Sequence, residues 1–139
     1  MSSRRRAREV ALKTLYQVEI TEFPWEKLFQ ESLPSENLDS NTEEFARNLI
    51  RKVLQHAEKL DELIKIKLEH WDFERVNLMD KNVLRIAIAE MLYFPEIPIK
   101  VSIDEAIELA KKYSYAEAGS FVNGILDAIA KTNKEIISR

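Results

Sequence analysis

The sequence predicts an all-α protein, organised as a single compact domain of about six or seven helices or as small helical subdomains that share a core. Three observations predict this fold class. Apolar residues recur at helical spacing along most of the 139 residues, and no segment alternates apolar and polar residues as a strand does. Helix-capping patterns precede several of these apolar runs. The chain has only two glycines and four prolines, which is typical of long helices joined by short loops.

The segment Leu78–Phe94 predicts the central helix. Its apolar residues cover most of the helical circumference, which is typical of a helix packed inside a bundle. It is too short and too charged to predict a membrane span. Asn77 is expected to cap its start, with Asp80 in the first turn. Pro95 and Pro98 end it, because proline lacks the amide donor that a helix needs.

The first half of the chain predicts two helices and a loop before a longer helical run. We expect helices over Ser3–Ile20 and Pro24–Leu33, and a loop over Pro34–Asn41. A third helix then begins with a capping box formed by Ser40 and Glu43, or by Asn41 and Glu44.

The apolar pattern of the third helix continues for about 29 residues, which is long for a globular domain. We therefore expect a break near His56–Lys59, although no glycine or proline marks it.

After the central helix, capping boxes predict two more helices. Ser102 and Glu105 precede a helix that ends near Tyr113, and Ser114 and Glu117 precede the last helix. The last helix contains both glycines of the chain, Gly119 and Gly124. Glycine costs about 1 kcal/mol relative to alanine in a helix, so we expect a neighbouring helix or a ligand to approach closely there.

The charges of the chain are unevenly distributed. Residues 1–13 carry a net charge of +4 on a remainder of −7. A basic start on an acidic body suggests an anion-binding patch, with nucleic acid as the usual partner, although a solvated basic helix end is an equal alternative. Arg4 and Arg8 fall toward the apolar side of their helix. Either the first turn of the helix overhangs the core, or the long arginine stems lie along the core with their guanidinium groups in water. Tyr16 sits at the edge of the apolar stripe, where packing is the commoner role.

Motifs of catalysis are missing from the sequence. There is no cysteine, and the two histidines, His56 and His70, are not spaced as ligands on one helical turn. No phosphate-binding glycine loop, nucleophile motif or dinucleotide fingerprint is found. We therefore expect a protein that is not an enzyme and that holds no metal or cofactor. Without a signal-type segment near Met1, the expected location is the cytoplasm.

Four stretches together resemble the NusB family of transcription antitermination factors. The start RRRAREVALKTLYQ is similar to the family's basic first helix, and SFVNGILDAIAK to its last helix. The stretches DKNVLRIAIAEMLY and IPIKVSIDEAIELAKKY are similar to its core helices. The resemblance covers nearly the whole chain. It implies two packed helical subdomains, about 1–57 and about 58–139, in one NusB-like RNA-binding domain.

The resemblance also implies a function and partners. NusB-like proteins bind the single-stranded boxA element of nascent RNA together with NusE, a ribosomal small-subunit protein. The pair joins the RNA polymerase antitermination complex and supports read-through, notably on ribosomal RNA operons. A basic arm would contact phosphates, and exposed aromatic residues would stack on unpaired bases.

The resemblance assigns roles to individual residues. It places Arg4, Arg5, Arg6 and Arg8 on RNA phosphates, and Tyr16 and Phe121 at the RNA surface beside them. Phe121 also falls on the apolar stripe of the last helix, so stacking on RNA and packing in the core stay open. Ser120 stands where family members often have a basic residue, so a phosphate contact there is in doubt. Glu74 and Asp80 match acidic positions near the NusE-facing surface; Asp80 could instead be a first-turn helix charge.

Other functions of the same fold predict different features. A related RNA cytosine methyltransferase needs a further catalytic domain, for which 139 residues leave no room. A helix-turn-helix DNA binder would use the last two helices, but the last offers few basic side chains to a major groove. A structural helical adaptor would show no RNA binding at all.

Overall fold

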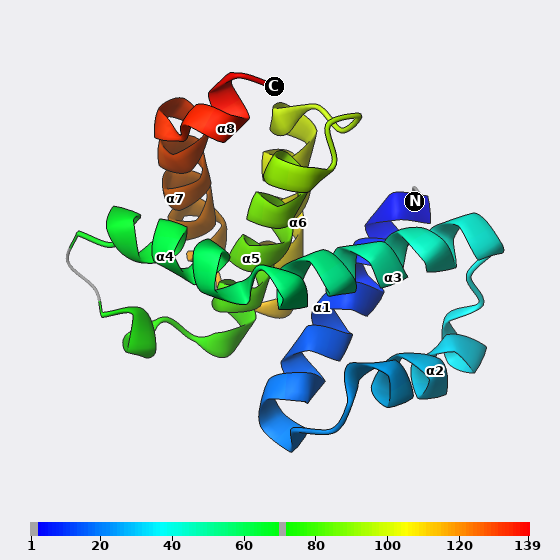
Figure 1. The fold of residues 1–139 in the computed structure, drawn as a ribbon. Helices are drawn as coiled ribbons and strands as arrows, with labels where there is room; N and C mark the ends of the chain where they lie inside the picture. Colours follow the sequence, from blue (N-terminus) through cyan, green and yellow to red (C-terminus); the bar gives the residue numbers. More distant parts are fainter. Residues whose placement is uncertain (1–2, 70–71) are drawn as a thin grey trace.

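The computed structural model describes residues 3–69 and 72–139, which form eight α-helices and a short 3-10 turn without a β-strand (Figure 1). This confirms the all-α prediction, with slightly more helices than expected. The helices are α1 (Ser3–Thr21), α2 (Trp25–Glu36), α3 (Ser40–Gln55), α4 (Ala57–Lys67), α5 (Leu78–Tyr93), α6 (Ile99–Tyr113), α7 (Ala118–Thr132) and α8 (Lys134–Ile137), and the 3-10 turn η1 is Phe73–Arg75.

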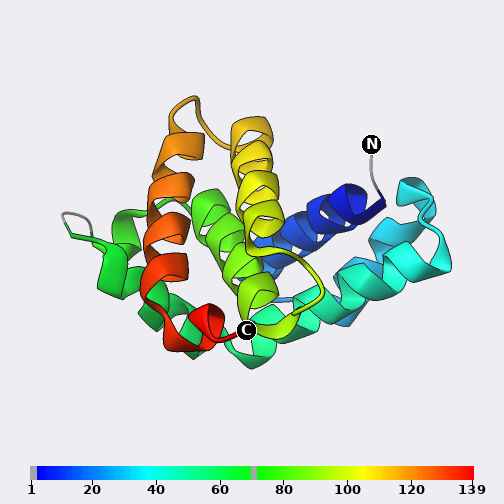
Figure 2. The same cartoon turned by 90° about the horizontal axis from the view of Figure 1, so that it is seen from above.

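Helix α5 is the centre of the fold, as its apolar sequence predicts. It packs against α1, α3, α4, α6, α7 and α8. Figures 1 and 2 show α1–α3 in one half of the molecule and α6 and α7 side by side in the other. Buried residues of both halves belong to one hydrophobic cluster, with Leu84 and Ile88 fully buried in it. The division into subdomains near residue 57 stays a prediction.

The predicted break in the long helical run lies at one residue. α3 ends at Gln55, α4 begins at Ala57, and His56 between them has φ −117° and ψ 23°. The His56 ring stacks on Tyr93 with the ring centres 4.2 Å apart. The break is therefore confirmed, and it is accompanied by a contact with α5 rather than by a glycine or proline.

The loop between α2 and α3 is shorter than the sequence predicts. α2 continues through Pro34 and ends at Glu36, and its C-cap residue Asn37 has a left-handed φ of 52°. Asp39 caps α3 by accepting a hydrogen bond from the Thr42 amide at 2.8 Å, so the predicted capping boxes at Ser40 and Asn41 are wrong. An αL asparagine followed by an aspartate cap makes this tight turn possible.

The predicted starts of the last two long helices are also wrong. α6 begins three residues earlier than Ser102, whose hydroxyl donates to Glu90 Oε1 at 2.9 Å instead of capping a helix. α7 begins at Ala118, and no side-chain hydrogen bond caps it. Gly119 confirms the expected close approach of a neighbouring helix, because a Cβ there would lie 3.4 Å from Ile107 on α6. At Gly124 nothing lies within 4 Å of such an atom.

Candidate nucleic-acid interface

The first turn of α1 presents two arginines beside the start of α6. The side chains of Arg4 and Arg5 are 49% and 41% exposed. They line an open groove of about 540 Å³, together with Pro98 and Val101. The Arg4 guanidinium lies 4.5 Å from the centre of the Phe45 ring, and its Nη1 is 3.9 Å from Glu96 Oε1. This loose pairing leaves the Arg4 head accessible to an external anion.

Arg5 and Arg6 are held by neighbouring elements. Arg5 Nε donates to Glu105 Oε1 of α6 at 2.9 Å. This hydrogen bond lowers the pKa of the Glu105 carboxyl and raises that of Arg5. Arg6 donates to the backbone carbonyl of Glu36 at the end of α2. Both arginines are therefore positioned by the fold. Arg5 is already paired with the Glu105 carboxylate, with which any phosphate would have to compete.

Arg8 lies inside the protein, 3% exposed, and not with its head in water. Its Nε and Nη2 donate to the two oxygens of Glu90 at 2.6 and 2.8 Å. Glu90 is 1% exposed and also accepts the Ser102 hydroxyl. The pair joins α1, α5 and α6 across the core. The expected phosphate contact does not fit this placement, because the guanidinium of Arg8 is enclosed and already paired.

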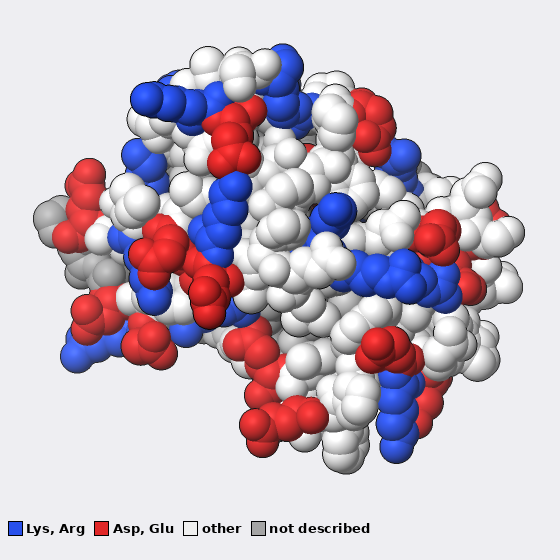
Figure 3. All heavy atoms as spheres, in the orientation of Figure 1, with Lys and Arg blue, Asp and Glu red and all other residues white. Residues whose placement is uncertain are grey.

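The seam between α1 and α6 continues with alternating charges. Lys112 Nζ lies 2.9 Å from Glu9 Oε2, and Lys13 Nζ lies 6.0 Å from the centre of the Tyr113 ring. Half-buried Tyr16 lies about one helical turn beyond Lys13 on α1. On the face drawn in Figure 3, basic and acidic side chains are likewise interspersed rather than segregated. The basic start is thus a row of largely paired cations, not an uncompensated patch.

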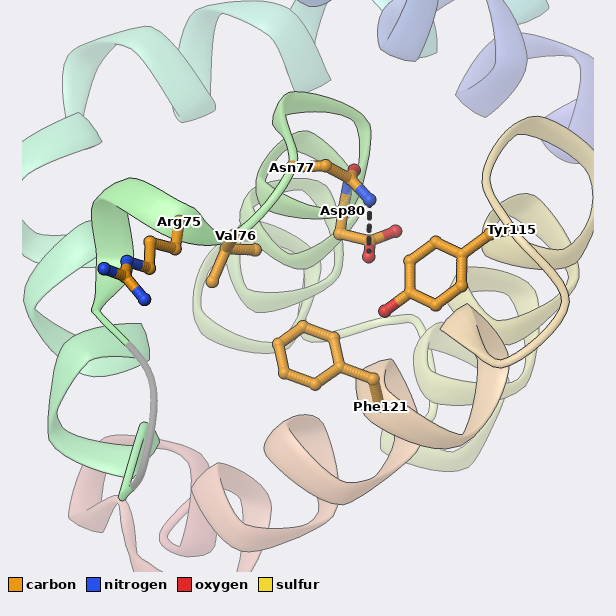
Figure 4. Close-up of a pocket in the computed structure, with 6 residues that line it drawn as sticks. All are labelled: Arg75, Val76, Asn77, Asp80, Tyr115 and Phe121. Atoms are coloured by element: carbon orange, nitrogen blue, oxygen red, sulfur yellow. Dashed lines mark hydrogen bonds between the residues drawn. The ribbon is translucent and has the colours of Figure 1, made fainter.

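The second candidate feature is a pocket between η1, α5 and α7. It has a volume of about 180 Å³ and is lined by Arg75, Val76, Asn77, Asp80, Tyr115 and Phe121 (Figure 4). Phe121 is half-buried and forms one wall, and Ser120 beside it is exposed. Phe121 therefore takes part in core packing and also faces a cavity, and its stacking on RNA stays a prediction.

Asp80 lines this pocket and does not lie on an outer surface. It is 1% exposed, its Oδ2 accepts from Asn77 Nδ2 at 3.2 Å, and its backbone amide donates to Asn77 Oδ1 at 2.8 Å. The latter bond confirms Asn77 as the cap of α5. Burial raises the pKa of Asp80, although the Ser114 hydroxyl and the Asn77 amide lower it in part. A NusE-facing role does not fit this burial, whereas Glu74 on η1 is exposed.

The structure separates the two groups of expected RNA-contacting residues. Arg4 and Arg5 meet the start of α6, near Pro98, whereas Phe121 lies beside Tyr115, just past the end of α6. The 15 residues of α6 correspond to a length of roughly 22 Å. Phe121 therefore does not lie beside the arginines, and a bound chain that reached both would have to follow α6.

The sequence assigned no binding role to several residues around these features. Glu90 and Glu105 hold the arginines, and Arg75 and Tyr115 line the pocket. One signal could have found Glu90: it is the lone acid on the apolar body of the central helix, while Arg8 falls on an apolar face of the first helix. Complementary buried charges of this kind are expected to pair.

Within residues 3–69 and 72–139, no group of three histidine or acidic side chains could hold a metal ion; His70 lies outside these ranges. In the same part of the chain, no helix has the length and apolar character needed to cross a membrane.

Comparisons with known proteins agree with the fold. The NusB family model matches residues 5–131. The transcription antitermination protein NusB of Salinibacter ruber is 44% identical over 131 residues, which cover 93% of this chain and 81% of that protein. A structure of T. maritima NusB superposes with a TM-score of 0.89 and 42% identity, covering 100% of this chain and 99% of the other.

A second similar structure contains partners. It is a crystal structure of the antitermination factors NusB and NusE in complex with dsRNA, 30% identical, with a TM-score of 0.85 and coverage of 94% of this chain and 98% of the other. The family model spans most of the sequence, and close relatives share both the sequence and the arrangement of helices. This chain belongs to the NusB family.

Proposed function

We propose that this chain is a transcription antitermination factor that binds the boxA element of nascent RNA together with NusE and supports read-through by RNA polymerase, notably on ribosomal RNA operons. The observation that carries the proposal is the similarity, over nearly the whole chain, to the NusB of a complex with NusE and dsRNA. The factor acts by binding alone, without catalysis or a cofactor, and in the cytoplasm, where nascent transcripts are found.

The residues divide into phosphate-binding and base-binding groups. Arg4, Arg5 and Arg6 at the start of α1 bind phosphates, which supply affinity without reading the sequence. Phe121 at the other end of α6 stacks on an unpaired base, as in other single-stranded RNA readers. Tyr16 lies on α1, about one helical turn beyond Lys13, and is a further candidate for stacking on a base. Arg8 supports the site indirectly, by fixing the first turns of α1 to α5.

NusE binds a separate surface in this proposal. Exposed Glu74 on η1 is the contact retained from the sequence analysis, since NusE is ribosomal and is expected to be basic. Asp80 is assigned to the pocket instead, because its carboxylate is buried.

The function is tested by titrating the protein with boxA-like RNA, a scrambled RNA of equal length and a duplex of the boxA-like RNA, each with and without NusE. We expect tightest binding to single-stranded boxA-like RNA, and tighter binding in the presence of NusE. Absence of RNA binding under all these conditions, at low salt, would contradict the proposal and favour a structural adaptor.

Replacing Arg4, Arg5 and Arg6 with alanine should flatten the salt dependence of RNA binding. Each lost phosphate contact lowers the log–log slope by about 0.7 for a single strand, so the triple variant should lose up to about 2. The binding of boxA-like RNA and of scrambled RNA should weaken by the same factor. The measurement is the RNA dissociation constant over a range of salt concentrations. A slope equal to that of the wild type would show that the arginines do not meet the RNA.

Glu105→Gln should tighten RNA binding severalfold at low salt. Glu105 lies 2.9 Å from Arg5 Nε and 3.5 Å from Arg8 Nη1, so its charge competes with a phosphate for Arg5. Glu62→Gln on α4 is the matched control, because Glu62 is exposed and makes only a 3.6 Å contact with Lys65. Weaker binding by Glu105→Gln, with the control unchanged, would show instead that Glu105 positions Arg5 for the RNA.

A further inference from the structure

Arg139, which follows α8, bonds to the backbone that joins α5 to α6. Its Nη1 donates to the Met91 carbonyl at 3.0 Å, and its Nη2 donates to the Pro95 carbonyl at 2.8 Å and to the Ile97 carbonyl. Pro95 and Ile97 are the two neighbours of Glu96 in the chain. One guanidinium therefore holds the last turn of α5 and the backbone on both sides of Glu96.

The position of Arg139 is fixed by the short helix before it. Asn133 caps α8 by accepting a hydrogen bond from the Ile136 amide at 3.1 Å. The Ile136 side chain is buried in the hydrophobic cluster, which anchors α8 against the core. Figures 1 and 2 both show the end marked C beside the loop between α5 and α6. The planar guanidinium offers several donors in a rigid fork, so it can clamp three carbonyls at once.

The clamped backbone carries an acid that faces Arg4. Both Glu96 and Arg4 line the open groove of about 540 Å³, and their side chains are about half-exposed. Glu96 Oε1 lies 3.9 Å from Arg4 Nη1, which is too long for a hydrogen bond. The Arg4 guanidinium rests instead on the Phe45 ring, 4.5 Å from its centre. Phe45 in turn meets the ring of Phe94, at the start of the clamped loop, with the ring centres 5.5 Å apart.

We propose that Arg139 is a positioning residue for RNA binding: by clamping the backbone around Glu96, it keeps the Glu96 carboxylate from closing on Arg4 and leaves Arg4 available to a phosphate. A charge-assisted hydrogen bond is about 2.8 Å long, so a loop movement of roughly 1 Å would close the pair. The closed pair would neutralise one cation of the groove. The inference rests on the proposed RNA-binding function and gives a part in it to a residue that itself contacts no RNA.

The test measures the binding of boxA-like RNA over a range of salt concentrations for the wild type and Arg139→Gln, with Lys134→Gln as the matched control. Arg139→Gln should weaken binding severalfold and lower the log–log salt slope by about 0.7, because Arg4 then pairs with Glu96 instead of one phosphate. Lys134 is exposed on α8, so its variant removes the same charge while the three carbonyl bonds remain. The control should bind RNA as the wild type does.

Glu96→Gln in the Arg139→Gln background decides whether the effect passes through Glu96. An amide at position 96 does not neutralise Arg4, so the double variant should regain the wild-type slope, and its affinity to within about twofold. Glu96→Gln alone should tighten binding less than it does in the Arg139→Gln background, since the pair is already open in the wild type. Loss of a merely structural Arg139 would not be rescued in this way.

Arg139→Lys separates the clamp from charge alone. Lysine keeps the positive charge but not the planar fork, so this variant should also weaken binding. Circular dichroism melting establishes that each variant is folded at the temperature of the titration. Hydrogen exchange of the Arg4 Nε–H with water, followed by NMR without RNA, gives a second readout. It should slow in Arg139→Gln, because the closed pair protects the guanidinium, and recover in the double variant.

The inference is overturned if folded Arg139→Gln keeps the wild-type slope, if Arg139→Lys binds as the wild type does, or if Glu96→Gln does not restore binding in the double variant. Failure of the wild type to bind boxA-like RNA would contradict the proposed function instead. In that case the exchange of the Arg4 Nε–H would still test the clamp, and equal exchange in the wild type and Arg139→Gln would contradict it.

Discussion

Replacing Glu90 with alanine should lower the free energy of unfolding by about 3–5 kcal/mol, because it removes the buried partner of the Arg8 guanidinium and leaves only the longer 3.5 Å contact of Arg8 Nη1 with Glu105. Arg8 and Glu90 are 3% and 1% exposed, and two hydrogen bonds of 2.6 and 2.8 Å join them. The substitution also removes the acceptor of the Ser102 hydroxyl. Urea denaturation at neutral pH, followed by circular dichroism, measures the loss.

Two controls separate the buried pair from charge in general. Glu96→Ala removes a 3.9 Å contact of an exposed arginine and should change stability by no more than about 0.5 kcal/mol. The double variant Arg8→Met, Glu90→Met replaces both charges with apolar groups of similar length and should recover most of the loss. A cost under about 1 kcal/mol for Glu90→Ala would show that Arg8 reaches water when unpaired.

Leu84→Ala in the centre of α5 should lower the free energy of unfolding by about 2–5 kcal/mol, and Ile88→Ala should do the same. Both side chains are fully buried in the hydrophobic cluster shared by the two halves of the molecule. The substitution removes apolar contacts and leaves a cavity that the surrounding helices fill only in part. Denaturant unfolding gives the difference, with the slope against urea expected to be unchanged.

Ile66→Ala provides the control for this second prediction. Ile66 is 67% exposed on α4, so its truncation should change stability by only about 0.5 kcal/mol. A loss well below 1 kcal/mol for both Leu84→Ala and Ile88→Ala would contradict the central position of α5.

Local chemistry determined most of the helical structure. Helical periodicity located all the long helices, and Asn77 and the two prolines after the central helix set its limits to within one residue. The break at His56 followed from length alone. These features could be predicted because a helix is decided by residues within a few positions of one another. Four short stretches also indicated the family, which the comparisons confirm.

The capping boxes show where local reasoning ended. Ser102 has the sequence of a helix cap, but its hydroxyl bonds to Glu90, twelve residues away on another helix. A serine hydroxyl donates to whichever acceptor the packing brings near, and the buried carboxylate of Glu90 requires donors. The same competition between local and distant partners explains the misplaced start of α6.

The tertiary structure alone decided what the charged residues do. Arg4 and Arg8 occupy adjacent turns of one helix, yet Arg4 is exposed while Arg8 is buried against Glu90, 82 residues further along the chain. Asp80 is a first-turn acid by its sequence and a buried pocket acid in the fold. The sequence by itself determined the helices, their order and the family. Packing decided which charges are paired, exposed or buried, because burial and electrostatic pairing depend on distances between residues that the chain order does not bring together.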